Sequence, residues 1–219
     1  MRIEFLAHAC FLLTSEAGIK VLTDPYESGG YGGMINYGPI EEIVDIVTVS
    51  HEHADHGFVA GLKSTPLIVK DPGTREEKGI TLKGFGTFHD TSSGSERGPN
   101  TIFVIQIDGL NICHLGDLGH MPDEKTISNI KPIDVLLAPV GGRPATLEPE
   151  EIMALAEKLA PKILIPMHFK TPQLGFPFKE LHVFLEGKDS VKKMNSSKLD
   201  ITKATLPATT EIYVLDHAL

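Results

Sequence analysis

The chain has 219 residues, with 29 acidic and 20 basic side chains and a formal net charge of −9. Its 41% hydrophobic and 22% charged content is ordinary for a globular domain and excludes a disordered or low-complexity chain. The acidic balance excludes nonspecific binding of nucleic acid or an anionic membrane as its main task, and ten His are the unusual feature of the composition.

The first part of the chain is predicted to be mainly β-structure, because short apolar, β-branched runs alternate with turn residues. Residues 44–50 form a β-branched run typical of a strand buried on both faces. The Gly- and Tyr-rich stretch 27–39 is predicted to be a long loop, and loops of this length often cover a functional site. The other strands expected here are 2–6, 9–14, 19–23, 67–70 and 80–87.

The second part begins with the clearest hairpin of the sequence, in which strands 101–107 and 110–115 flank an Asp-Gly turn. An amphipathic helix is predicted over 146–160, with Pro149 near its first turn. The other elements expected here are helices 123–130 and 178–186 and strands 134–138, 162–167, 199–202 and 211–215. The order predicts one α/β domain, residues 1–219, with hairpins early and βα units later.

A segment that contains several potential metal ligands follows the predicted strand 44–50 directly. It places His51, His53, Asp55 and His56 in the pattern HxHxDH. Neutral imidazoles and carboxylates are the ligands that Zn²⁺ and neighbouring first-row metals accept. The alternative is a polar loop whose histidines have no function, but four desolvated ionisable groups after a core strand are costly without a metal. The pattern therefore predicts a metal site.

Three further residues of ligand type stand at the carboxyl ends of other predicted strands. They are His89, Asp117 and His168. Open α/β architectures place their sites at such strand ends. Each of these residues alone is a weak signal, because a single strand-end His is more often structural. Together they provide the additional ligands that a two-metal site needs.

The order HxHxDH, His, Asp, His resembles that of the metallo-β-lactamase superfamily of binuclear metallohydrolases. The resemblance runs from about residue 1 to about residue 172. It is closest to the small branch that includes the ascorbate-6-phosphate lactonase, and it implies an αββα four-layer sandwich with its metals at one edge of the two sheets. Further segments carry it: LAHAC (6–10), TDP (23–25), HLGDLGH (114–120), PVGG (139–142) and PMHF (166–169).

The resemblance also implies a ligand set for two divalent metal ions. The first metal would be bound by His51, His53 and His89, and the second by Asp55, His56 and His168, with Asp117 bridging the two. Zn²⁺ is the expected metal, although Mn²⁺ and Fe²⁺ accept the same ligands. The resemblance further implies that Asp24 orients a metal-bound His, whereas the alternative is a turn residue before Pro25.

The implied chemistry is direct hydrolysis of an ester-like, lactone or phosphoester bond in a small anionic substrate by a metal-bridging hydroxide. Asp55 would orient the hydroxide. His8 and His120 are candidates for proton transfer or substrate contact, and a structural hydrogen-bonding role remains open for both. Arg97 and Arg143 could bind the substrate anion, but loop arginines need no such function.

Two alternatives to a hydrolase remain open. One is a non-catalytic metal-binding or regulatory protein on the same fold, and the other is redox chemistry on a di-iron centre, for which a Glu would be expected at position 53 instead of His. The chain is shorter than the lactonase, so that enzyme's substrate is not carried over. It also has no room for the inserted domain of the nucleic-acid-processing members of the superfamily.

The compartment expected from the sequence is the cytoplasm. Cys10 and Cys113 lie in apolar stretches without metal-binding or redox spacing, and we expect buried free thiols. No apolar run approaches the roughly 20 residues that span a bilayer. Residues 5–13 are interrupted by His8 and lack the cleavage site of a signal peptide. The oligomeric state is left open.

Overall fold

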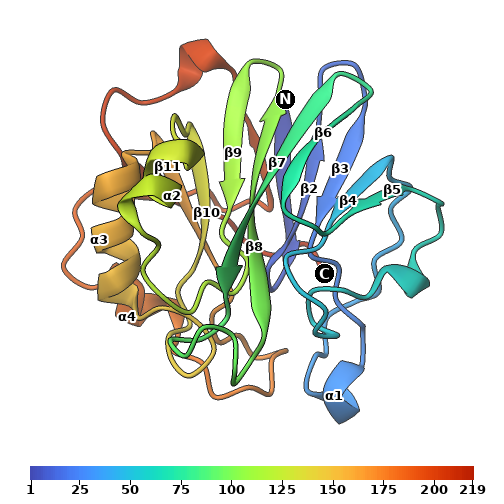
Figure 1. Cartoon of the computed structure of the whole chain (residues 1–219), viewed down its shortest axis with the longest axis horizontal. Coiled ribbons are helices and arrows are strands. Elements are labelled where there is room, and N and C mark those ends of the chain that lie inside the picture. The colour runs from blue at the N-terminus through green and yellow to red at the C-terminus, as the bar shows by residue number, and fades with distance from the viewer.

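The computed structural model describes residues 1–219 and consists of two β-sheets that pack face to face (Figure 1). The first sheet has six strands in the order β13-β1-β2-β3-β4-β5, and the second has eight in the order β12-β14-β11-β10-β9-β8-β7-β6. A core of 44 buried residues contains side chains of both sheets. The predicted mixed α/β fold with two sheets is confirmed.

The first sheet begins as an antiparallel meander and continues with parallel pairs at β3–β4 and β4–β5. Strands β1, β3, β4 and β5 therefore point the same way, so their carboxyl ends lie at one edge. The strands of this sheet are β1 (Arg2–Ala7), β2 (Cys10–Thr14), β3 (Lys20–Thr23), β4 (Ile46–Thr48), β5 (Leu67–Val69) and β13 (Lys198–Asp200).

Both faces of the first sheet are apolar. Ile3 and Ile46 point into the core between the sheets, whereas Leu22 and Val47 belong to a second buried cluster on the outer face. This alternation of buried side chains explains why the sequence around β4 has no polar face, and it agrees with the prediction of a strand buried on both sides.

The second sheet joins an antiparallel hairpin region to a parallel one. Strand β8 runs antiparallel to β7 and β9, and β9, β10, β11, β14 and β12 follow in parallel. The strands of this sheet are β6 (Gly73–Glu77), β7 (Ile80–Phe88), β8 (Pro99–Ile107), β9 (Leu110–His114), β10 (Val135–Pro139), β11 (Ile163–Met167), β12 (Val191–Lys193) and β14 (Glu211–Val214).

Helices cover the outer face of the second sheet (Figure 1). They are α2 (Glu124–Ile130), α3 (Pro149–Leu159) and α4 (Leu181–Leu185). Helix α3 begins three residues later than predicted, because Pro149 disfavours helical geometry at Glu148, which is extended and caps the helix together with Glu151. Residues 146–148 therefore belong to the loop before α3 and not to the helix.

The outer face of the first sheet is covered mostly by loop. The segment 26–44, with the one-turn helix α1 (Gly30–Gly33), packs on it through Tyr26, Ile35 and Tyr37. The short 3₁₀ helices are η1 (Val59–Gly61) and η2 (Lys203–Thr205). The fourth layer of the sandwich is thus thin on this side, and the long predicted loop forms much of it.

Strands β6 and β12 were not predicted. Residues 73–77 are exposed over most of their length and contain no large apolar side chain, and residues 191–193 expose both lysines. A strand without a buried face shows no alternation of apolar and polar residues, so its sequence carries no strand signal. These two strands form because they pair with a neighbouring strand. No helix has the length and apolar content needed to pass through a lipid bilayer.

Candidate metal centre

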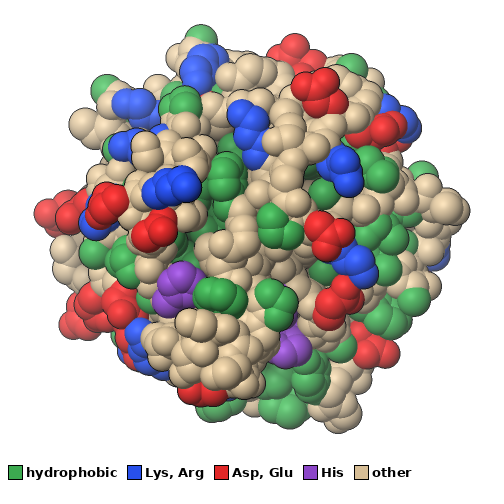
Figure 2. All heavy atoms as spheres, viewed as in Figure 1, with side chains coloured by type: hydrophobic (Ala, Val, Ile, Leu, Met, Phe, Trp, Pro, Cys, Tyr) green, Lys and Arg blue, Asp and Glu red, His purple; other side chains and the backbone are tan.

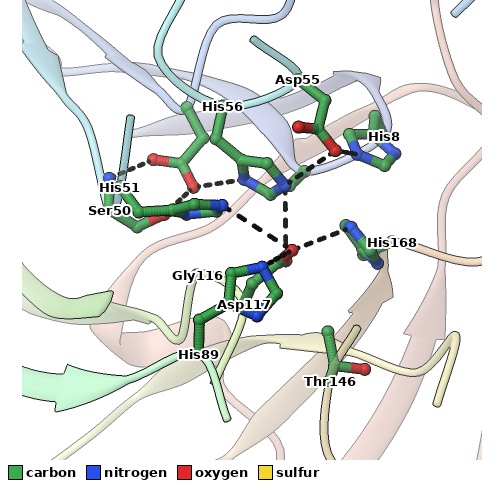
Figure 3. Close-up of polar contacts among 12 residues, drawn as sticks. His8, Ser50, His51, Asp55, His56, His89, Gly116, Asp117, Thr146 and His168 are labelled. Atoms are coloured by element: carbon green, nitrogen blue, oxygen red, sulfur yellow. Dashed lines mark hydrogen bonds and ion pairs between the residues drawn. The ribbon is translucent and has the colours of Figure 1, made fainter. Parts of the chain in front are cut away.

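The potential metal ligands lie at one edge of the two sheets, in loops that follow strands of both (Figure 3). His51, His53, Asp55 and His56 come after β4 in the first sheet. The second sheet supplies ligands from three strand ends, with His89 after β7, Asp117 after β9 and His168 after β11. His8 follows β1 and Asp24 follows β3. Most of these side chains are buried.

The side chains form three groups whose potential ligand atoms lie within 4.8 Å of one another. The first group, which we call cluster 1, contains His51, His53 and His89, and the second, cluster 2, contains His8, Asp55, His56 and His168. The third, Asp24 with His51 and His56, connects the two. Clusters 1 and 2 correspond to the two ligand sets that the resemblance implied, with His8 added to the second. The metal-binding role of each residue stays a prediction, whereas their convergence is a feature of the structure.

Asp117 lies between the two clusters (Figure 3). Its Oδ2 is 3.1 Å from Nε2 of His89 in cluster 1 and 3.2 Å from Nε2 of His168 in cluster 2. Its Oδ1 is 3.4 Å from Nε2 of His56. One carboxylate therefore faces nitrogens of both clusters, which is the place that a bridging ligand would occupy.

The donor set fits divalent metal ions. Nε2 of His51, His56 and His168 and Oδ1 of Asp117 are buried, and none has a hydrogen-bond partner. Buried polar atoms without partners are costly, and they recur at sites that hold an ion. Because these four atoms are imidazole nitrogens and a carboxylate oxygen that face one another, Zn²⁺ and similar metals suit them.

Asp24 supports histidines of both clusters from behind. Its Oδ2 accepts hydrogen bonds from Nδ1 of His56 at 2.9 Å and from the Ser50 hydroxyl at 2.5 Å. The Ser50 oxygen in turn accepts from Nδ1 of His51 at 2.9 Å. With Nδ1 protonated in both rings, Nε2 of each ring presents its lone pair to the centre. This agrees with the predicted role of Asp24, and Ser50 is an additional participant.

We expect Asp24→Asn to lower the affinity for the metals about 10- to 100-fold, because an amide has one acceptor oxygen, whereas the carboxylate accepts from the Ser50 N–H, the Ser50 hydroxyl and the His56 ring N–H. Competition with a chromophoric chelator measures the affinity. The control is Asp45→Asn, since Asp45 also accepts a backbone N–H, that of Lys20, and lies outside both clusters. Equal affinities for the two variants would contradict the supporting role of Asp24.

Asp117 is held by a turn that the sequence analysis did not single out. Gly116 has φ +58°, and a Cβ there would lie 2.3 Å from Oδ1 of Asn100 and 2.5 Å from Cβ of Ser50. Oδ1 of Asn100 accepts the Asp117 N–H, and Nδ1 of His114 accepts the Gly116 N–H. Only glycine fits this close approach, so the turn fixes where the Asp117 carboxylate lies.

The comparisons with known proteins agree with this geometry. Residues 2–168 match the family model described as the β-lactamase superfamily domain. A UPF0173 metal-dependent hydrolase of Pelotomaculum thermopropionicum is 31% identical over 201 residues, which cover 78% of this chain and 85% of the relative. The chain belongs to the metallo-β-lactamase superfamily.

Solved structures show the same fold. A Thermotoga maritima protein, assigned to the metallo-β-lactamase superfamily as a candidate Zn-dependent hydrolase, is 33% identical with a TM-score of 0.80, and the match covers 98% of this chain and 97% of that one. CmlA of Streptomyces venezuelae, a diiron β-hydroxylase, is 15% identical with a TM-score of 0.61 over 80% of this chain and 46% of its own, which shows the fold alone.

Membership of the metallo-β-lactamase superfamily confirms the prediction of a metal-dependent hydrolase at the level of the family. The relatives reported above carry the UPF0173 and Zn-dependent hydrolase descriptions. The narrower resemblance to the ascorbate-6-phosphate lactonase stays a prediction.

Burial and charge act on the titrating groups of this superfamily site in opposite directions. Burial lowers the pKa of His56, but the carboxylates of Asp117 and Asp55 outweigh it and hold that pKa well above its usual value of about 6.5. Burial also lowers the pKa of His51, below its usual range. Because His56 must lose its Nε2 proton to bind a metal, metal uptake by this site releases a proton and weakens as the pH falls.

Within cluster 2, His8 contacts Asp55. It is 2% exposed, and its Nε2 is 3.2 Å from Oδ2 of Asp55, which accepts a hydrogen bond from it. Burial and the neighbouring His168 lower the pKa of His8 to about 4, so the ring is neutral at pH 7. It does not line the cavity beside the clusters. Its contact with Asp55 fits the structural hydrogen-bonding alternative, and a proton-transfer role stays a prediction.

His120 also lies away from the cavity. Its Nε2 accepts the backbone N–H of Phe88 at 3.2 Å, and its Nδ1 donates to the carbonyl of Met121 at 3.1 Å. Both ring nitrogens thus contact backbone groups, which fits the structural hydrogen-bonding alternative, and a catalytic role stays a prediction. The sequence analysis selected His120 because it ends the segment HLGDLGH (114–120), and in the structure this end belongs to the turn after Asp117.

A cavity of about 330 Å³ opens beside the two clusters. Five of the predicted ligands line it together with aromatic side chains from two loops, Tyr31, Phe176 and Phe178. Arg97 lines this cavity and also a neighbouring one of about 780 Å³, which includes Lys70, Pro72 and Phe88. Figure 2 shows acidic and basic side chains interspersed over the face in view.

Proposed function

We propose that this protein is a binuclear metal-dependent hydrolase that cleaves an ester-like, lactone or phosphoester bond in a small anionic substrate. The observation that supports the proposal most directly is the position of Asp117 between the two clusters, in which Nε2 of His51, His56 and His168 has no hydrogen-bond partner. Zn²⁺ is the proposed metal, and the ligand chemistry also suits Mn²⁺ and Fe²⁺. The proposed compartment is the cytoplasm, supported by two buried cysteines that remain unpaired.

When bound, two such metals supply an activated water at neutral pH and polarise the attacked group. The chain's own residues hold this arrangement in place. His8 donates to Asp55, Asp24 holds His56 directly, and Ser50 passes the same support to His51. Buried ligands that are held by hydrogen bonds need little reorganisation during the reaction, which is the main source of electrostatic catalysis.

Arg97 is the better candidate for binding the anion of the substrate. Its half-buried guanidinium lines both cavities and forms no ion pair within the protein. Nη2 of Arg143, in contrast, donates to both carboxylate oxygens of Glu151 at 2.9 and 2.8 Å. The sequence offered both arginines equally as candidates for binding the substrate anion. The structure distinguishes them, because Arg143 pairs with Glu151 and Arg97 pairs with no carboxylate.

Asp90 fixes the loop that carries Arg97. Burial would raise the pKa of Asp90, but the backbone N–H groups of Arg97, Gly94, Ser92 and Glu96 donate to its carboxylate and lower the pKa to about 2. At neutral pH the charged carboxylate of Asp90 thus holds the loop through its backbone N–H groups. This fixes the position of Arg97 while its guanidinium stays free of an ion pair with Asp90.

We expect Arg97→Met to raise KM for an anionic substrate about 10- to 100-fold, because a charge-assisted hydrogen bond contributes about 1.5–3 kcal/mol. The value of kcat should change little. Arg143→Met is the matched control, and it should leave KM within about twofold. Steady-state kinetics of both variants against an anionic and an uncharged ester separate loss of the charge from loss of packing. Equal effects on the two esters would contradict the assignment.

The test of the whole proposal is a panel of lactones, phosphodiesters, phosphomonoesters and esters with the metal-loaded protein. We expect turnover of at least one class and its loss in His53→Ala. The same samples should contain two metals per chain by elemental analysis. Two bound metals with no turnover across the panel would favour the alternative of a non-catalytic metal-binding or regulatory protein.

The open cavity argues for catalysis over that alternative, because the long loop 27–39 borders the clusters without sealing them. The di-iron alternative is disfavoured by the imidazole at position 53, where that chemistry would be expected to use a Glu. Elemental analysis after aerobic purification addresses it directly.

A further inference from the structure

The loop 27–39 contains a feature that the metal site alone does not explain. Tyr31 lies in the left-handed region, at φ 51° and ψ 42°, within a run of glycines. Gly29, Gly32 and Gly33 also have positive φ, at 77°, 67° and 91°. Glycine adopts this conformation without cost, but a bulky side chain is strained there. Strain of this kind is concentrated at functional sites, which raises the question of what Tyr31 does.

The loop is tied to a second segment from the other sheet. The Asn36 N–H donates to the carbonyl of Gln173 at 2.9 Å, and the Gly175 N–H donates to that of Met34 at 2.6 Å. Ile35 forms an isolated β-bridge with Leu174. The base of the loop is therefore fixed, so Tyr31 is presented from a rigid support.

The tip places the Tyr31 side chain at the mouth of the metal cavity. Its ring meets Phe176 edge to face, with centroids 5.2 Å apart and planes at 77°. Its hydroxyl donates to Oδ1 of Asp55 at 3.3 Å, on the side of that carboxylate opposite to His8. The residue is 45% exposed and lines the cavity together with Asp117 and His168.

We propose that Tyr31 is a catalytic residue whose hydroxyl donates a hydrogen bond to the substrate oxygen that gains negative charge during cleavage. The inference rests on the proposed hydrolase function. In the free protein Asp55 accepts this long hydrogen bond. A substrate oxygen at the clusters would compete with Asp55 for the hydroxyl as that oxygen gains negative charge during cleavage. A positioned neutral donor stabilises developing charge without any transfer of its own proton.

Tyr31→Phe in the metal-loaded full-length protein tests the role. Removing one such donor costs about 100-fold in kcat at other oxyanion sites, and we expect a loss of roughly 10- to 100-fold here because the loop donor is less buried. KM should stay within about threefold, and both metals should be retained. Tyr213→Phe is the control, since that ring lies on β14, outside the cavity.

A second measurement does not depend on turnover. Inorganic phosphate is a tetrahedral anion, as is the intermediate of ester or lactone hydrolysis, and calorimetry gives its affinity for the metal-loaded protein. We expect about tenfold weaker binding to Tyr31→Phe than to the unmodified protein. If no substrate of the panel is hydrolysed, the proposed function fails, and the phosphate titration still decides the role of Tyr31.

Two results would overturn the inference. One is unchanged kcat together with unchanged phosphate affinity, which would leave Tyr31 as a rim residue. The other is a loss of activity in proportion to a lost metal, which would mean that the hydroxyl only positions Asp55. A fall in kcat at full metal content, or weaker phosphate binding at full metal content, supports the proposal.

Discussion

Asp117→Asn is expected to reduce kcat/KM by at least about 10³-fold and to lower the metal content below two per chain. The carboxylate faces nitrogens of both clusters, with His89 at 3.1 Å and His168 at 3.2 Å, so no other residue has the same position. An amide of the same shape has no charge and can donate, so it is a poor ligand between two cations. Elemental analysis and steady-state kinetics on the same preparation measure both effects.

Asp134→Asn provides the matched control for this substitution. Asp134 is similarly buried, and its carboxylate pairs with Lys203 and accepts the Asn111 N–H, far from either cluster in the hydrogen-bond network. It should keep two metals per chain whatever its effect on stability. An Asp117→Asn protein with two metals and normal kcat/KM would remove the basis for a shared ligand.

Removal of the metals should lower the thermal midpoint by on the order of 10 °C or more. Each ligand that binds only the folded state at 100 times its Kd adds about 2.7 kcal/mol, so two metals add about 5 kcal/mol, and a domain of about 200 residues shifts by about 2–4 °C per kcal/mol. The physical reason is local, because His51, His56 and His168 each bury an unpartnered Nε2 that a bound ion would satisfy. Calorimetric scans before and after chelation, and after addition of Zn²⁺, measure the change.

The difference in thermal midpoint between the metal-loaded and the metal-free protein should shrink as the pH falls, because a proton on Nε2 of His56 competes with the metal for that nitrogen. His168→Ala should lose a large part of the stabilisation by added metal. His182→Ala should keep all of it, since that ring is 75% exposed and pairs only with Glu180. A metal-dependent shift of the same size in both variants would place the bound ions elsewhere.

The fold was predictable where burial leaves a pattern in the sequence. Residues 44–50 and the hairpin of β8 and β9 were predicted because their apolar side chains face one or two cores. Strands β6 and β12 were missed because their side chains face solvent. The start of α3 was placed too early, since the effect of Pro149 on the preceding residue was not included.

The parts of the site that follow strands were predictable, because the carboxyl ends of these strands meet at one edge of the sandwich. The sequence analysis therefore placed His89 and His168 at the same edge as the segment after β4. Contacts between loops were not predictable in this way. The Tyr31 hydroxyl contacts Asp55, which lies 24 residues later in the sequence, and Asn100 accepts the N–H of Asp117, 17 residues later. No sequence periodicity relates the two residues of either pair. The pairing of Arg143 with Glu151 follows from the start of α3, which only the structure fixes.

The support that Asp24 gives to both clusters has a consequence for how the centre fills. One carboxylate holds His56 directly and His51 through Ser50, so ordering the ring of one cluster also orders a ring of the other. If the centre binds two metals as proposed, the first ion would bear the entropic cost of ordering these side chains, and the second would bind to side chains already ordered. We therefore expect cooperative loading, with few molecules that hold a single metal.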